Sequence, residues 1–205
     1  KAIELKPDYA MAYSNLGNIL LALDKLQEAE LTTRKAIELK PDFAMAYSNL
    51  ATILRDHGNL QEAEVCARKA IELNPNLAES HFNLGNILND LGKLKEAELS
   101  TRKSVKLKPD FADAYLNLGS ILIHLEKLEE AKLVTRKAIE LKPAFSMAYS
   151  NLGNILIALD KLQEAKEVFQ KCIEIEPNEV NYISSLLSVL SSLCSWDEIE
   201  KYSAY

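Results

Sequence analysis

The sequence predicts an all-α protein, a solenoid in which antiparallel helix pairs follow one another along the chain. The first observation behind this is the spacing of the prolines, which recur every 34 residues. They are Pro7, Pro41, Pro75, Pro109, Pro143 and Pro177. The second is that each interval holds two segments with apolar residues at helical spacing. The third is a small residue at one fixed place in each segment. A fixed period of about 20 to 50 residues is typical of repeat proteins.

The period divides the chain into one solenoid domain of five complete repeats with a partial repeat at each end. The complete repeats are 10–43, 44–77, 78–111, 112–145 and 146–179. Residues 1–9 are the predicted end of a preceding repeat, and we expect a fragment of a longer protein because the chain opens on Lys1. Residues 180–205 are predicted to form a divergent sixth repeat that caps the array or joins it to another region.

Each repeat is predicted to contain two helices joined by a short turn. In the first repeat the helices cover 10–23 and 26–39, with the turn at 24–25. The apolar residues that indicate the first helix are Tyr13, Leu16, Leu20 and Leu23, and those of the second are Leu26, Ala29, Ala36, Ile37 and Leu39. The second helix is expected to end before Pro41, because a residue that precedes proline disfavours the helical conformation.

Small residues indicate where the two helices of a repeat meet. With the residues of each repeat numbered from 1 to 34, position 8 of the first helix holds Gly17, Ala51, Gly85, Gly119 and Gly153. Position 20 of the second helix holds Ala29, Ala63, Ala97, Ala131 and Ala165. A glycine inside a helix costs about 1 kcal/mol relative to alanine. Its recurrence therefore predicts a close helix–helix approach, which Gly85→Leu would overpack.

These residues resemble the tetratricopeptide repeat family, whose 34-residue units carry an aromatic residue, Leu-Gly, two alanines and a closing proline. In the first repeat the matching residues are Tyr13, Leu16, Gly17, Ala29, Ala36 and Pro41. The resemblance implies a right-handed superhelix with the first helices on its concave wall. Two positions depart from the family. Leucine replaces its second aromatic residue, and its large residue late in the second helix is Thr33, Ala67, Thr101 and Thr135, with only Phe169 large.

A row of small polar residues follows the side of the first helix opposite its apolar stripe. Position 6 holds Asn15, Asn49, Asn83, Asn117 and Asn151, and position 9 holds Asn18, Thr52, Asn86, Ser120 and Asn154. Asparagine is a mediocre helix former, but its amide offers one acceptor and two donors. The row therefore predicts binding of extended or disordered polypeptide through its backbone. The alternatives are that these asparagines bond one another or water, or that they remain from duplication of the repeat.

Position 2, on the same side of the helix, is the candidate for ligand selectivity. It holds Met11, Met45, Glu79, Asp113 and Met147. Methionines such as Met45 make adaptable contacts, and the acidic pair Glu79 and Asp113 would favour a basic ligand. Ordinary surface variation explains the same residues. No lysine or arginine occupies positions 2, 5 or 6 of the complete repeats. The carboxylate clamp by which some members of the family bind chaperone C-termini is therefore not expected.

Composition excludes several other classes of function. The net charge of −6 argues against a nucleic-acid partner, which requires a basic face. The apolar runs are too short for a membrane helix. His57, His81 and His124 lie in different repeats without the spacing of metal ligands, and Cys66, Cys172 and Cys194 are expected to fill the core. We therefore predict no metal, no cofactor and no active site, and a cytoplasmic protein because three cysteines make no disulfide framework. The oligomeric state stays open.

The C-terminal end carries a second resemblance. The Asn-Leu-Gly-Asn run of the repeats and the segment Cys194, Ser195, Trp196 and Asp197 are similar to the repeat region of O-linked N-acetylglucosamine transferases and its junction with the catalytic region. In that family the position 6 asparagines hold the acceptor polypeptide, which implies a glycosyltransferase parent. The alternatives are a stand-alone scaffold, the repeat region of another transferase such as a sulfotransferase, and, for the segment itself, a simple capping helix.

Overall fold

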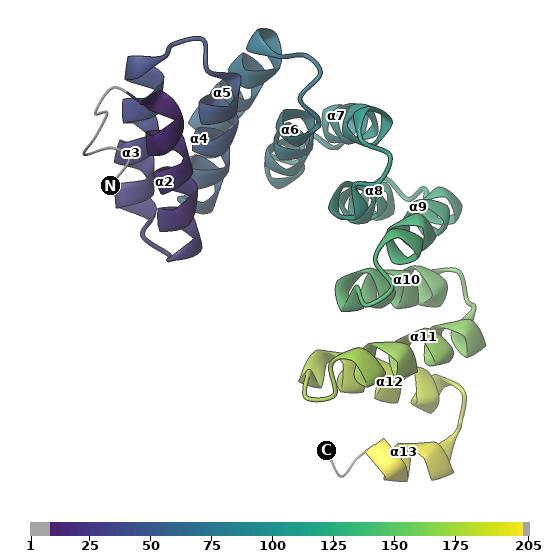
Figure 1. Cartoon of the computed structure of the whole chain (residues 1–205). Helices are drawn as coiled ribbons and strands as arrows, with labels where there is room; N and C mark the ends of the chain where they lie inside the picture. The colour runs from purple at the N-terminus through teal and green to yellow at the C-terminus, as the bar shows by residue number, and fades with distance from the viewer. Residues whose placement is uncertain (1–8, 203–205) are drawn as a thin grey trace. The chain divides into compact units, whose positions relative to one another are not determined.

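The computed structural model describes residues 9–202, so residues 1–8 of the preceding repeat and residues 203–205 of the last lie outside the described residues. All regular elements in 9–202 are helices, and they occur in consecutive pairs (Figure 1). The first helices of the pairs are α2 (Ala10–Ala22), α4 (Ala44–Asp56), α6 (Ala78–Asp90), α8 (Ala112–His124), α10 (Ser146–Ala158) and α12 (Val180–Ser192). The second helices are α3 (Leu26–Leu39), α5 (Leu60–Leu73), α7 (Leu94–Leu107), α9 (Leu128–Leu141), α11 (Leu162–Ile175) and α13 (Trp196–Tyr202). The predicted all-α fold class is confirmed.

The helices form two compact bodies, an N-terminal body up to Pro109 and a C-terminal body from Asp110. Within the N-terminal body each second helix packs on its own first helix, α3 and α5 also pack on the next first helix, and α2, α4 and α6 contact in series. No comparable contact joins α3 to α5 or α5 to α7 among the described residues. In the C-terminal body α8 contacts α10 in the same way. The first helices therefore form the more tightly packed layer of each body, whose exposed side we call the inner face.

The turn inside each helix pair passes through the left-handed backbone region. The residues at this place are Asp24, Gly58, Gly92, Glu126, Asp160 and Cys194, with φ between 53° and 82°. This conformation ends the first helix, so α2 stops at Ala22. Leu23 follows the helix and is 62% exposed, and its predicted place in the apolar stripe is wrong. The predicted end of α3 before Pro41 is confirmed, since Lys40 leaves the helical region with φ −142°.

The close approach predicted at position 8 is confirmed. A Cβ atom added to Gly17, Gly85 or Gly119 would overlap the hydroxyl oxygen of Thr33, Thr101 or Thr135, and one added to Gly153 would lie 2.5 Å from Phe169 Cζ. In the second repeat the corresponding residues are Ala51 and Ala67, both fully buried. The late position of the second helix, where the sequence departs from the family, thus covers the small residue of the first helix. Threonine or phenylalanine at this position of the second helix requires glycine at position 8 of the first helix. Alanine at this position leaves room for alanine at position 8.

The core also includes a position that the sequence analysis missed. Position 10 of the first helix is isoleucine in all five complete repeats. Ile53, Ile87 and Ile121 are fully buried and Ile155 is 1% exposed, whereas Ile19 on α2 is 57% exposed. No described helix precedes α2, and burial at position 10 therefore depends on a neighbouring repeat.

Charged residues cover the outer side of the second helices. Glutamate and arginine one helical turn apart form the pairs Glu30–Arg34, Glu64–Arg68 and Glu98–Arg102, with N···O distances of 2.8 to 2.9 Å. Arg34 also reaches Glu62 of the next repeat at 2.6 Å, and Arg68 reaches Glu96 at 2.7 Å. Because the arginine side chains of these pairs remain more than a third exposed, each pair contributes only about 0.2–1 kcal/mol. They nevertheless link successive second helices that lack direct packing.

The third repeat has an unusually polar interior. Ser80 is fully buried, Ser104 is buried where three other repeats have alanine, and His81 takes the place of a tyrosine. The Ser104 hydroxyl donates to the Ala78 carbonyl at 2.9 Å, but the Ser80 hydroxyl has no partner among residues 9–202. His81 Nε2 lies 3.0 Å from the Pro75 carbonyl oxygen. Burial, and secondarily the nearby charge of Lys103, lowers the pKa of His81 below its ordinary value, so the folded chain favours the neutral ring. His81 is therefore a core residue.

We expect Gly85→Ala to lower the free energy of unfolding by about 1–3 kcal/mol, because the new methyl group overpacks against Thr101. Adding Thr101→Ala should restore part of that loss, since the double variant carries the alanine pair found at Ala51 and Ala67. Chemical denaturation of the wild type, both single variants and the double variant measures the coupling. An unchanged midpoint for Gly85→Ala would contradict the tight contact.

Acid should weaken the fold through His81. The unfolded chain binds a proton with the ordinary histidine pKa near 6.5, whereas the buried ring binds it less readily, so stability is lost as the pH falls through that range. We expect the wild type to lose more stability than His81→Tyr between about pH 7.5 and about pH 5.5, where few carboxylates titrate. The tyrosine variant retains His57 and His124, and equal losses for both proteins would show that His81 does not contribute.

Candidate functional site

The position 6 asparagines lie on the first helices, and their exposure differs along the array. Asn15 on α2 is exposed, whereas Asn49, Asn83, Asn117 and Asn151 are half-buried. The sequence analysis placed all five on an open surface. The half-buried members lie partly beneath neighbouring residues, which limits how their amides can turn.

Three of these amides donate a hydrogen bond to a serine of the preceding repeat. Asn49 Nδ2 donates to Ser14 Oγ at 2.9 Å, Asn83 Nδ2 donates to Ser48 Oγ at 3.1 Å, and Asn151 Nδ2 donates to Ser120 Oγ at 2.8 Å. Part of each amide is therefore used inside the protein. The partner is a serine hydroxyl, and not a second asparagine as one alternative had it.

The serine comes from one of two positions a helical turn apart. Ser14 and Ser48 occupy position 5 of their repeats. In the fourth repeat position 5 is Leu116, and the bond to Asn151 comes from Ser120 at position 9. Asn117 differs from the other half-buried members, because its Nδ2 atom is buried without a partner in the part of the chain that the structure describes.

Each bonded amide keeps hydrogen-bonding capacity. An asparagine amide has two N–H donors and a carbonyl acceptor, and the serine uses one donor. No group among residues 9–202 donates to the Oδ1 atoms of Asn49, Asn83 or Asn151, and these oxygens are not fully buried. At position 9, Asn18 and Asn154 are exposed and Asn86 is half-buried. One acceptor per amide thus remains for a ligand. Asn49 and Asn151 also keep one donor, whereas Asn83 Nδ2 contacts both the hydroxyl and the carbonyl oxygen of Ser48.

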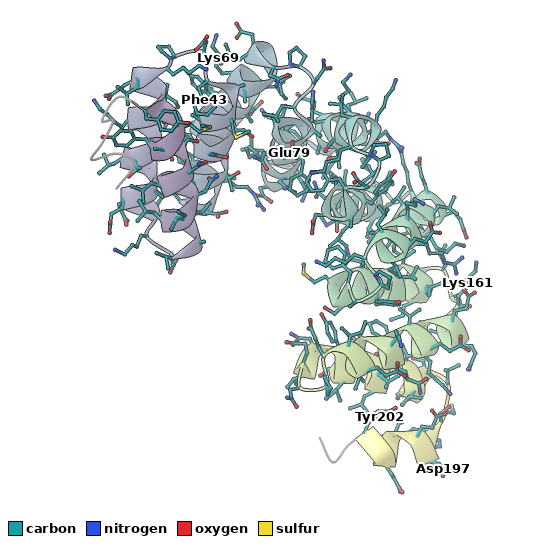
Figure 2. All side chains as sticks on the ribbon, viewed as in Figure 1. Phe43, Lys69, Glu79, Lys161, Asp197 and Tyr202 are labelled. Carbon is teal, nitrogen blue, oxygen red and sulfur yellow. The ribbon has the colours of Figure 1, made fainter. Side chains whose placement is uncertain are left out.

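The candidate selectivity residues at position 2 lie at the surface. Met11, Met45 and Met147 are 46%, 47% and 60% exposed, and Asp113 is also exposed. Glu79, on α6 (Figure 2), accepts a hydrogen bond from Lys108 Nζ at 2.9 Å, which lowers the pKa of that carboxyl. The lysine offsets the charge of Glu79, so the acidic pair is weaker than the sequence indicates.

The histidines and cysteines do not form a reactive cluster. No group of three potential metal ligands occurs among the described residues. Burial raises the pKa of Cys66 to about 11 and that of Cys172 to about 12, which leaves both thiols protonated at neutral pH. Cys194 is exposed, so its predicted place in the core is wrong. It occupies the left-handed turn before α13, and this turn residue points away from the packed helices.

None of the helices in residues 9–202 combines the length and the apolar character needed to cross a membrane.

Sequence profiles of the tetratricopeptide repeat match most of the chain. One profile matches residues 10–43, 44–77 and 146–179, a second matches 66–98 and a third matches 112–145. The chain belongs to the tetratricopeptide repeat family. A comparison with curated proteins found no match. A tetratricopeptide repeat array accounts for the consecutive helix pairs and for the small residues at their contact.

Solved tetratricopeptide proteins share the fold. YrrB, described as a TPR protein with an unusual peptide-binding site, is 25% identical, with a TM-score of 0.68 over 90% of this chain and 95% of YrrB. PilF of Pseudomonas aeruginosa is 20% identical, with a TM-score of 0.85 over 96% of this chain and 89% of PilF. MamA is 23% identical, with a TM-score of 0.70 over 81% of this chain and 97% of MamA. The last two likenesses concern the fold alone.

The sequence analysis missed the serines as partners of the asparagine row. Position 5 was considered only because it lacks the cations of a carboxylate clamp. The available signal was serine at Ser14, Ser48 and Ser150, next to asparagine at position 6. Pairing across repeats was not visible, because the bonded residues are 31 or 35 apart in sequence.

We expect Asn83→Ala to lower the free energy of unfolding by about 0.5–1.5 kcal/mol, because it removes a hydrogen bond between repeats. Asn15→Ala is the matched control: Asn15 is exposed and has no partner among residues 9–202, and alanine is the better helix former. Thermal and urea unfolding measure both variants. A larger loss for Asn15→Ala than for Asn83→Ala would contradict the assigned bond.

Proposed function

We propose that the inner face of this tetratricopeptide array binds extended or disordered polypeptide through its backbone. The observation that supports this most directly is the row of amides. Three of them are bonded to serines, each of the three keeps an acceptor, and Asn49 and Asn151 also keep a donor. A peptide backbone offers one donor and one acceptor per residue. The two sets of groups are complementary whatever the side chains of the ligand. YrrB, which is described as having a peptide-binding site, adds support from the same fold.

Each body carries its own set of these asparagines. The N-terminal body holds Asn15, Asn49 and Asn83, with Asn18 and Asn86 beside them, and the C-terminal body holds Asn117, Asn151 and Asn154. Each hydrogen bond contributes about 1 kcal/mol. Ordering of the polypeptide offsets part of this gain, so we expect modest affinity.

Selectivity would come from the residues that flank the row. Met45 offers an adaptable apolar contact, and Asp113 offers a carboxylate for a basic side chain. Glu79 contributes less, because Lys108 already pairs with it. We therefore propose a weak preference for basic polypeptides.

The parent protein is a separate part of the proposal. A glycosyltransferase parent is supported only by the resemblance of Cys194 to Asp197 and of the Asn-Leu-Gly-Asn run. The profiles and solved structures described above add nothing to it, and Cys194 also fits the turn found in every helix pair. A stand-alone scaffold and another transferase, such as a sulfotransferase, remain the alternatives. The coding sequence after Tyr205 distinguishes them through a nucleotide-sugar domain, a stop codon or a sulfonucleotide-binding loop.

Two further parts of the proposal rest on composition. We propose a cytoplasmic location because the cysteines form no disulfide framework. We propose no nucleic-acid partner because the chain carries a net charge of −6.

Replacing Asn49, Asn83, Asn117 and Asn151 together by alanine should weaken binding to several unrelated unstructured peptides, because backbone contacts carry little sequence information. The expected loss is about tenfold or more, and circular dichroism should show unchanged helical content, since alanine favours the helix. Titration calorimetry or fluorescence anisotropy measures the affinities.

The control variant replaces four exposed aliphatic residues on the outer side of the second helices, Leu31, Val65, Leu99 and Leu133, by alanine. It should bind every peptide as the wild type does. Equal affinity of the wild type and the asparagine variant would overturn the proposal. A loss confined to one peptide would indicate side-chain recognition instead.

A further inference from the structure

A row of amides can read a backbone only if each amide faces the same way. The oxygen and nitrogen of an asparagine amide are nearly the same size, so the side chain turned by 180° occupies the same space. An amide turned in this way presents N–H donors to a ligand at the place where the next asparagine of the row presents its carbonyl acceptor. A common orientation of the amides, which we call the polarity of the row, therefore requires a neighbouring group at each asparagine. That group must accept a hydrogen bond from Nδ2 and must be unable to donate one to Oδ1.

Ser48 supplies such a contact to Asn83. Nδ2 of Asn83 lies 3.1 Å from the Ser48 hydroxyl oxygen and 3.2 Å from the Ser48 carbonyl oxygen. A carbonyl oxygen only accepts hydrogen bonds. The turned amide would place Oδ1 against this oxygen, so Nδ2 must face Ser48.

Ser120 achieves the same result at Asn151 in another way. Its hydroxyl donates to the Leu116 carbonyl at 3.3 Å, one helical turn back on α8. The hydroxyl has a single proton, so toward Asn151 it can only accept. The 2.8 Å bond from Asn151 Nδ2 is consistent with that role. Ser14, which is 1% exposed, also accepts a hydrogen bond from Asn49 Nδ2, at 2.9 Å.

We propose that Ser14, Ser48 and Ser120 are positioning residues that fix the polarity of the asparagine row. They do not touch the ligand. By holding Nδ2 toward the preceding repeat, they leave Oδ1 of Asn49, Asn83 and Asn151 to accept from the backbone N–H groups of an extended polypeptide. The row thereby recognises N–H donors in particular. This inference rests on the function proposed above.

The fourth repeat supports a selected role for the hydroxyl. Position 5 there is Leu116, whose side chain cannot accept a hydrogen bond, and serine appears at position 9 on the same helix. The bond to the next asparagine is kept although its source has moved by one turn.

The test compares the wild type with the triple variant Ser14→Ala, Ser48→Ala and Ser120→Ala. The probes are an unstructured Gly-Ser-rich peptide and its analogue in which alternate backbone amides are replaced by esters, which removes N–H donors. The wild type should bind the ester analogue about tenfold or more weakly than the amide peptide. In the triple variant this ratio should fall, because the amides of Asn49 and Asn151 no longer hold their acceptors toward the ligand, whereas the carbonyl oxygen of residue 48 still faces Asn83.

Two single variants provide the controls. Ser150 occupies position 5 of the fifth repeat and has no hydrogen-bond partner among residues 9–202, so Ser150→Ala should keep the wild-type ratio. Ser120→Thr retains a hydroxyl and should also keep it. A purely structural role for the serines would lower the thermal midpoint and both affinities together, without moving the ratio.

The outcomes separate this inference from the proposed function. If the wild type binds the amide and ester peptides with equal affinity, the proposed recognition of the peptide backbone would be overturned, and the positioning role with it. If the wild type and the triple variant both prefer the amide peptide over the ester peptide by the same ratio, the positioning role alone would be overturned. A ratio that falls in the triple variant and persists in both controls supports the inference.

Discussion

The array depends on the close approach of two helices at one small residue in each repeat. Gly17, Gly85 and Gly119 each lie beneath a threonine of the second helix, and Gly153 lies beneath the Phe169 ring. Alanine faces alanine in the second repeat. The combined size of the two residues is limited by the distance between the helices, so a gain on one helix must be offset on the other. This limit permits a glycine that helix propensity alone would disfavour.

Packing within a repeat determines what each repeat offers its neighbours. The first helices α2, α4 and α6 contact one another in series, and α8 contacts α10, whereas the second helices meet through charged side chains such as Arg34 and Glu62. The inner layer is therefore held by apolar packing and the outer layer by solvated ion pairs of small individual value. Position 10 isoleucines and position 6 asparagines both lie on the inner layer. The isoleucines stabilise the contact between repeats, and the asparagines are oriented by that contact.

The polar groups of this chain fall into two kinds. In the third repeat, Ser80 and His81 are buried where other repeats carry mostly apolar or aromatic side chains, and they weaken the interior without forming a site. On the inner face, Asn49, Asn83 and Asn151 are half-buried, bonded on one side and open on the other. An amide that is held but not fully used suits recognition, because the cost of ordering it is met during folding.

The sequence by itself determined the helix pairs, their limits and their tight contact. These features follow from local signals: the residue before Pro41 leaves the helix, and apolar residues recur at helical spacing. Only the tertiary structure decided which side chains are free. Leu23 and Cys194 are exposed because the turn between paired helices carries them outward, and Ile53 is buried by a neighbouring repeat. The orientation of Asn83 depends on Ser48, 35 residues earlier. Burial and orientation arise from groups that are distant in sequence, and a periodic pattern identifies such positions without showing what lies against them.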